Sequence, residues 1–179
     1  MERTAQFSRC GQYRYRLGRR WGDGPAILWI MLNPSTADAE RDDPTIRRCI
    51  GFSRAWGFGA MEVVNLFALR TPDTAALRAH TAPIGPRNDR VIRAAAPAAR
   101  PRIAAWGALP WAASRANEVR TLLGGRWLCL SQTASGAPRH PLYAAASLRT
   151  VPFATYVKRP SCPAEALRRA SLDPRSLSC

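Results

Sequence analysis

Lysine is almost absent from this chain, histidine occurs only twice, and acidic residues are few. The 179 residues include 27 lysines and arginines against 12 aspartates and glutamates, a formal net charge of +15. Lys158 is the single lysine, so arginine carries nearly all of the positive charge. Such an excess favours a polyanionic partner, although a GC-rich genome produces the same bias toward Ala, Pro and Arg. We expect DNA, single- or double-stranded, as the partner.

Long apolar runs and paired cysteines are also missing. No run approaches the roughly 18–20 apolar residues of a membrane span, and residues 1–6 hold no apolar signal-peptide core. The five cysteines are scattered without a Cys-x-x-Cys pair, which argues against a zinc ribbon or a thioredoxin-type site. Cys49 and Cys129 lie in apolar stretches and are expected in the core. We expect a cytoplasmic monomer with no membrane partner, no metal and no other cofactor.

Short apolar blocks indicate the strands. Residues 26–32 form a continuous apolar run, typical of a strand buried on both faces of a parallel sheet. Further strands are expected over 61–68, 102–106 and 126–130. Residues 12–17 alternate and indicate one strand of a hairpin, which Gly18 would end, so that Arg19 and Arg20 face solvent or an anion.

Helical patterns fall between these strands. Asp43 and Pro44 have the residue types of an N-cap and a first helical turn, and Gly57 or Gly59 would end that helix. Two more helices are expected over 88–96 and 111–123. Helices between consecutive strands return the chain to the same end of the sheet, so the strands should run parallel.

The order of elements predicts an α/β fold. We expect a three-layer α/β/α sandwich with a mostly parallel four-stranded central sheet and an N-terminal β-hairpin. Residues 1–153 would form a single α/β domain. Residues 154–179, rich in Pro, Ser and Arg, would form a loosely ordered basic tail with one short helix at 163–171.

Polar residues gather where the predicted strands end. Ligands of open parallel sheets bind outside the carboxyl ends of the strands. The residues expected there are Asn33, Ser35, Asn65, Trp106, Ser135, Gly136, Arg139 and His140. Each alone has an ordinary explanation, since an Asn before Pro starts turns and a lone loop histidine is usually solvated. Together they predict a pocket.

The motifs resemble those of the uracil-DNA glycosylase superfamily, in its mismatch-specific and thymine-DNA branch. The resemblance lies in Asn33-Pro34-Ser35, Val63-Val64-Asn65-Leu66-Phe67, Ile103-Ala104-Ala105-Trp106-Gly107 and Arg139-His140-Pro141. It implies a glycosylase-like fold. Met31 replaces the usual glycine of the first motif, Leu142 replaces the serine of the second, and no Gly-Gln-Asp-Pro aspartate is present. Any catalysis would then resemble that of the slower Asn-dependent branch.

A closer resemblance covers nearly all of residues 5–153. Segments such as Met31-Leu32-Asn33-Pro34-Ser35-Thr36-Ala37 and Pro138-Arg139-His140-Pro141-Leu142-Tyr143 are similar to an uncharacterised bacterial and phage family. This family is catalogued as domain of unknown function number sixteen forty-three. It implies no established activity.

The glycosylase resemblance implies a DNA N-glycosylase that hydrolyses the bond to a flipped, modified or mismatched base, in DNA repair or phage defence. Asn33 would orient the water and His140 would hydrogen-bond the departing base. The other implied roles are base stacking by Trp106 or Phe67, substrate binding by Ser35, Asn65, Ser135 and Gly136, backbone contacts by Arg47, Arg48 and Arg139, and a wedge of Leu142 and Tyr143.

Two alternatives stay open, and so does the role of one acidic pair. In the first alternative, the chain is a non-catalytic nucleic-acid-binding protein on the same scaffold. In the second, it is a hydrolase that acts on a free modified nucleotide. Asp42 and Asp43 would read a base edge, shape the pocket, or only cap the helix.

Overall fold

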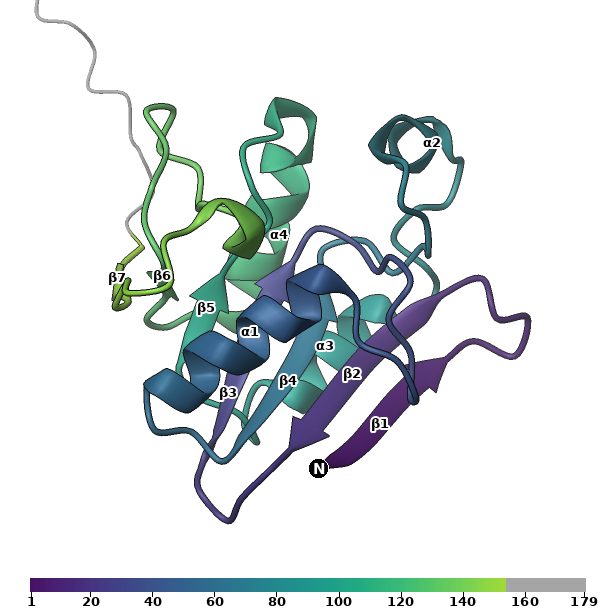
Figure 1. The fold of residues 1–179 in the computed structure, drawn as a ribbon. Helices are drawn as coiled ribbons and strands as arrows, with labels where there is room; N and C mark the ends of the chain where they lie inside the picture. Colours follow the sequence, from purple (N-terminus) through teal and green to yellow (C-terminus); the bar gives the residue numbers. More distant parts are fainter. Residues whose placement is uncertain (154–179) are drawn as a thin grey trace, which may run out of the picture.

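The computed structural model describes residues 1–153 of the chain (Figure 1). The expected basic tail at 154–179 and its short helix at 163–171 lie outside the described residues. The strands are β1 (Glu2–Phe7), β2 (Arg14–Arg20), β3 (Ala26–Met31), β4 (Ala60–Asn65), β5 (Arg102–Ala104), β6 (Leu128–Cys129) and β7 (Val151–Pro152). The α-helices are α1 (Pro44–Ala55), α2 (Thr74–Ala79), α3 (Asn88–Ala95) and α4 (Ala113–Leu123), and the 3-10 turns are η1 (Pro110–Ala112) and η2 (Pro141–Tyr143).

The strands form one sheet of seven in the order β1-β2-β4-β3-β5-β6-β7. The pairs β3–β4, β3–β5 and β5–β6 are parallel, whereas β1–β2, β2–β4 and β6–β7 are antiparallel. The α/β class is confirmed. The prediction of a mostly parallel four-stranded sheet of the uracil-DNA glycosylase type with a hairpin beside it is wrong, because the sheet is seven-stranded and mixed.

The hairpin extends the central sheet instead of standing beside it. β2 pairs with β4 in register from Leu17 opposite Val63 to Arg20 opposite Ala60. The prediction that Gly18 ends the strand is wrong. Gly18 lies within β2, between Thr4 of β1 and Glu62 of β4. At the opposite edge, β7 pairs with β6. These long-range pairings account for the three strands that the prediction of a four-stranded sheet lacks.

Helices cover both faces of the sheet (Figure 1). On one face, α1 buries Ile46, Cys49 and Phe52 in a cluster with Trp29 of β3 and its neighbours. On the other face, α3 and α4 pack against a second cluster that includes Ile30 of β3. β3 is therefore buried on both faces, which confirms the interpretation of its continuous apolar run.

The first long helix begins and ends where its sequence indicates. Asp43 is the N-cap, and its Oδ1 accepts the Ile46 N–H at 2.8 Å, while Pro44 occupies the first turn. Trp56 is the C-cap, and Gly57 follows with a φ of +85°, which a glycine adopts without strain. Both cysteines that were expected in the core are buried, and burial raises the pKa of the Cys129 thiol to about 11.

A close backbone approach fixes the turn before β3 against the start of β4. The carbonyl of Gly59 accepts N–H groups from Trp21 and Gly22, and the Gly59 N–H donates to the Pro25 carbonyl. A Cβ on Gly59 would lie 2.7 Å from Gly24 Cα and 2.8 Å from the Gly22 carbonyl oxygen. Both contacts are with backbone, which cannot rotate away.

Gly59→Ala should therefore destabilise the protein, by about 1–3 kcal/mol, the usual cost of overpacking. The control is Gly51→Ala on the exposed side of α1, where a Cβ meets nothing within 4 Å. That substitution should stabilise the helix by about 0.5–1 kcal/mol. Urea unfolding measures both free energies, and equal values for the two variants would contradict the contact at Gly59.

Candidate functional site

A pocket of about 470 Å³ lies where the loops after β3, β4 and β5 meet η2. This volume is within the range of small-molecule sites. Six of the residues expected to act on a substrate line it: Asn33, Ser35, Asn65, Trp106, His140 and Tyr143. The topology thus brings together side chains that are more than a hundred positions apart in the chain.

Asn33 joins two of these loops through its amide nitrogen. The Nδ2 group donates to the carbonyl of Thr71 at 2.7 Å and to that of Pro34 at 3.0 Å, with a longer contact of 3.4 Å to Leu69. No hydrogen bond reaches its Oδ1 from the residues that the structure describes. The donor of Asn33 is therefore used by the protein, and the group left for a ligand is an acceptor.

Asn65 presents the opposite polarity to the same pocket. Its side chain lies at the end of β4 and is only 1% exposed. The Nδ2 atom is buried and has no hydrogen-bond partner among residues 1–153. An unpaired buried donor costs free energy, so a ligand acceptor placed here would gain more than one at the surface.

His140 lies next to η2 with its ring in the pocket wall. The Leu142 N–H donates to Nδ1 over a long 3.4 Å, which favours the neutral tautomer with its proton on Nε2. Burial lowers the pKa of His140, and the charge of Asp43 opposes this shift in part. The ring is thus held neutral, with one N–H available as a donor.

Trp106 separates the pocket from a second groove of about 310 Å³. Its ring is buried and meets Trp127 and Phe153 edge-on. The expected substrate-binding residues Ser135 and Gly136 line this second groove and not the first pocket. Phe67, the second choice for base stacking, is buried against Trp111 and lines neither.

The three arginines expected to contact a nucleic-acid backbone differ in the hydrogen bonds that their side chains make within the protein. Arg48 donates to the carbonyls of Ala144 and Pro141, so it joins α1 to η2. Arg139 donates to Ser131 Oγ at 3.2 Å. Arg47 is exposed, and its side chain bonds only the Asp42 carbonyl within the described part of the chain. The arginine of this set that remains most accessible to a partner is Arg47.

The two expected wedge residues are exposed at η2. Leu142 is 43% exposed and Tyr143 is 76% exposed, and both are large apolar side chains in contact with water. Tyr143 also lines the pocket. The rim of the pocket at η2 thus carries two exposed apolar side chains, which a stacked ligand or a partner would cover.

An arginine and an aspartate also line the pocket, and the arginine was not among the residues expected there from the sequence. Arg14 of β2 lines it although it is only 2% exposed. The alternation of residues 12–17 indicated a strand but not the burial of Arg14, which bonds the Ala37 carbonyl in the loop after β3. Asp43 both caps α1 and lines the pocket, which answers the question left open for this residue.

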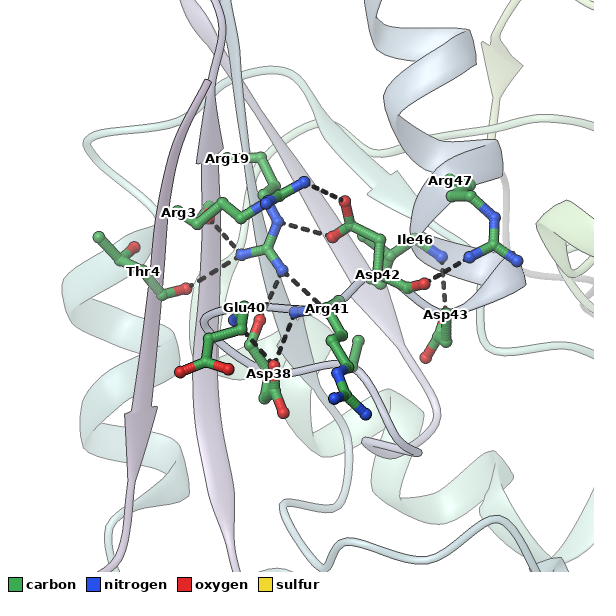
Figure 2. Close-up of polar contacts among 12 residues, drawn as sticks. Arg3, Thr4, Arg19, Asp38, Glu40, Arg41, Asp42, Asp43, Ile46 and Arg47 are labelled. Atoms are coloured by element: carbon green, nitrogen blue, oxygen red, sulfur yellow. Dashed lines mark hydrogen bonds and ion pairs between the residues drawn. The ribbon is translucent and has the colours of Figure 1, made fainter.

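The loop that covers Arg14 is fixed by a second buried arginine, Arg19 (Figure 2). Arg19 Nε donates to Asp42 Oδ1 at 2.8 Å, and Nη2 donates to the Asp38 carbonyl at 2.6 Å. Nη1 donates to the Gly18 carbonyl at 2.8 Å. Asp42 thus acts as the counterion of Arg19, which is buried within β2 and does not follow the end of the strand as expected.

The family comparison matches residues 14–142 to a family described as "Protein of unknown function (DUF1643)". The match spans more than half of the chain, so the chain belongs to this family. No curated protein and no solved structure matches the chain.

Two features are absent from residues 1–153. None of their helices is long and apolar enough to cross a bilayer. Their His, Cys, Asp and Glu side chains form no group of three or more that could hold a metal ion.

Removal of the Asp42 carboxylate should destabilise the protein strongly. Asp42→Ala leaves the Arg19 guanidinium buried without a counterion, at a cost of about 3–5 kcal/mol. Glu40→Ala removes the same charge from the same loop, but Glu40 is exposed and forms no ion pair with residues 1–153, so its effect should stay within about 0.5 kcal/mol. Thermal and urea unfolding measure both, and similar losses would contradict the role of Asp42.

The lowered pKa of His140 predicts a pH dependence of stability. As pH falls below about 6.5, the unfolded chain binds a proton that the folded protein resists, so the free energy of unfolding decreases. His140→Gln should remove this contribution, and its stability should fall less between about pH 6.5 and pH 5 than that of the wild type. His80→Gln serves as the control. An unchanged pH profile in His140→Gln would refute the assignment.

Proposed function

We propose that the protein is a DNA N-glycosylase that hydrolyses the bond between deoxyribose and a modified or mismatched base. One observation carries the proposal: a single pocket combines an acceptor on Asn33, donors on Asn65 and neutral His140, and the wall formed by Trp106. This combination matches the charges that develop when an N-glycosidic bond breaks.

In that reaction the sugar becomes positive and the base becomes negative, while water adds its oxygen to C1′ and gives a proton to the base. The Oδ1 of Asn33 accepts a hydrogen bond from the water and orients it toward the sugar. The nearby carboxylate of Asp43 favours the positive sugar electrostatically. The Nε2–H of His140 and the Nδ2–H of Asn65 stabilise the negative charge on the base.

The apolar residues of the pocket fit an aromatic ligand. Trp106 offers a buried aromatic wall, and Met31, Leu32 and Leu109 add apolar surface. A base in a duplex reaches such a site only after it is flipped out of the stack. Exposed Leu142 and Tyr143 lie at the rim, where they can fill the gap that the flipped base leaves.

The charge of the chain supports DNA as the carrier of the base. The net charge of +15 attracts a polyanion, and the exposed Arg47 lies at the start of α1, next to the Asp43 of the pocket wall. The same charge also favours a binding protein without catalysis. That alternative predicts DNA binding that weakens steeply with salt and no release of a base from any substrate.

The test is a screen of labelled oligonucleotides that carry uracil, mismatched thymine, hypoxanthine or hydroxymethylated and glycosylated pyrimidines. We expect abasic sites on at least one of them. On that substrate His140→Ala should reduce the single-turnover rate by about 10²–10³-fold, the usual effect of removing one such donor. Asn33→Ala should also reduce it strongly, because the water loses its orientation.

The control for this screen is His80→Ala, since the second histidine bonds Gln12 and the Ala82 N–H and does not line the pocket. It should cleave as the wild type does. Cleavage that persists unchanged in Asn33→Ala and His140→Ala would contradict the roles assigned to these two residues. Absence of cleavage on every substrate would favour the binding protein.

A further inference from the structure

Arg14 is the most unusual group in the pocket, because it is a buried cation without a counterion. The residue is 2% exposed, and it forms no ion pair within 4.0 Å among residues 1–153. Its Nη1 donates to the Ala37 carbonyl, and this is its one side-chain hydrogen bond in the described structure. A buried charge of this kind is costly unless a partner neutralises it.

The unpartnered atoms of Arg14 form one edge of the guanidinium. Among residues 1–153, Nε is buried without a partner and no hydrogen bond leaves Nη2. Nε–H and one Nη2–H point in the same direction, so they form a fork that fits two oxygens of a carboxylate or a phosphate. The fork belongs to a side chain that lines the pocket.

Residues 1–153 do not supply the missing anion. The charge of Asp43 acts on Arg14 from within the pocket wall, but Asp43 Oδ1 is bonded to the Ile46 N–H and no ion pair forms. The burial of Arg14 lowers its pKa to about 10, so the group is still charged at neutral pH. An anionic ligand would therefore replace a desolvated charge by a neutralised pair.

We propose that the pocket binds a ligand with an oxyanion, a carboxylate or a phosphate, held side-on by the Nε–Nη2 edge of Arg14. The inference rests on the proposed function for the nature of the rest of the ligand, a nucleobase. The oxyanion then has two sources, a substituent on the base or the phosphate of a nucleotide. In either case Arg14 is the residue that selects an anionic substrate over its neutral analogue.

The test measures binding of matched anionic and neutral probes to the full chain by calorimetry. One arm compares deoxyuridine 5′-monophosphate with deoxyuridine, and the other compares 5-carboxyuracil with uracil. We expect the anionic member of one pair to bind at least about tenfold tighter, as a charged hydrogen bond typically gives. The arm that shows this gain identifies the source of the oxyanion.

Variants then assign the preference to the fork. Arg14→Gln should abolish it, and Arg14→Lys should retain only part of it, because an ammonium cannot bind two oxygens side-on. Arg70→Gln is the control: it removes the same charge from an exposed residue that contacts Gly11 and Phe7 outside the pocket. It should preserve the preference.

Equal binding of both members in both pairs by the wild type would overturn the inference, and this result does not depend on the folding of any variant. A preference that survives in Arg14→Gln would overturn it as well. These measurements use no DNA cleavage, so a failure of the inference can be distinguished from a failure of the proposed function. Cleavage of neutral modified bases without anion preference refutes the inference alone, and anion preference without cleavage of any oligonucleotide refutes the glycosylase alone.

Discussion

The site depends on the interaction of Arg19 with the loop between β3 and α1. Arg19 is 1% exposed, and it donates to the Asp42 carboxylate and to the carbonyls of Gly18 and Asp38 (Figure 2). These bonds hold the loop against β2 and bring Asp43 to the pocket wall, where it also caps α1. Without them, the loop would lose the buried charge pair that orders it, and the pocket would lose one side.

β2 contributes two buried arginines with opposite hydrogen bonding. Arg19 bonds the loop through Nε and Nη2 and the Gly18 carbonyl of its own strand through Nη1, so it is a structural cation with its own counterion. Arg14 bonds only the Ala37 carbonyl and faces the pocket without one. The same strand thus buries one arginine with all of its nitrogens hydrogen-bonded and another with only one nitrogen bonded among residues 1–153. The incomplete bonding of Arg14 therefore points to function, since unpaired buried charges persist where a ligand completes them.

Local signals predicted β3, α1 and the polar ends of the strands, because they depend on neighbouring residues. Asp43 and Pro44 form a helix start in any context, and the apolar run of β3 requires two covered faces. The extent of the sheet was not predictable in this way, since the pairing of β2 with β4 joins residues over forty positions apart. The burial of Arg14 has the same origin: alternation shows which side chains share a face and not whether a distant loop covers it.

The position of Asn33 explains why the pocket holds an amide where a carboxylate would be a stronger base. Its Nδ2 lies 2.7 Å from the Thr71 carbonyl and 3.0 Å from the Pro34 carbonyl. An aspartate here would set a negative oxygen against these acceptors with no donor between them, which would open the loops that form the pocket. The amide satisfies the carbonyls with its nitrogen and leaves its oxygen without a partner among residues 1–153. The same constraint that shapes the loops thus limits this position to a weak acceptor, and the carboxylate that the pocket does contain, Asp43, comes from the start of a helix, where backbone N–H groups stabilise it.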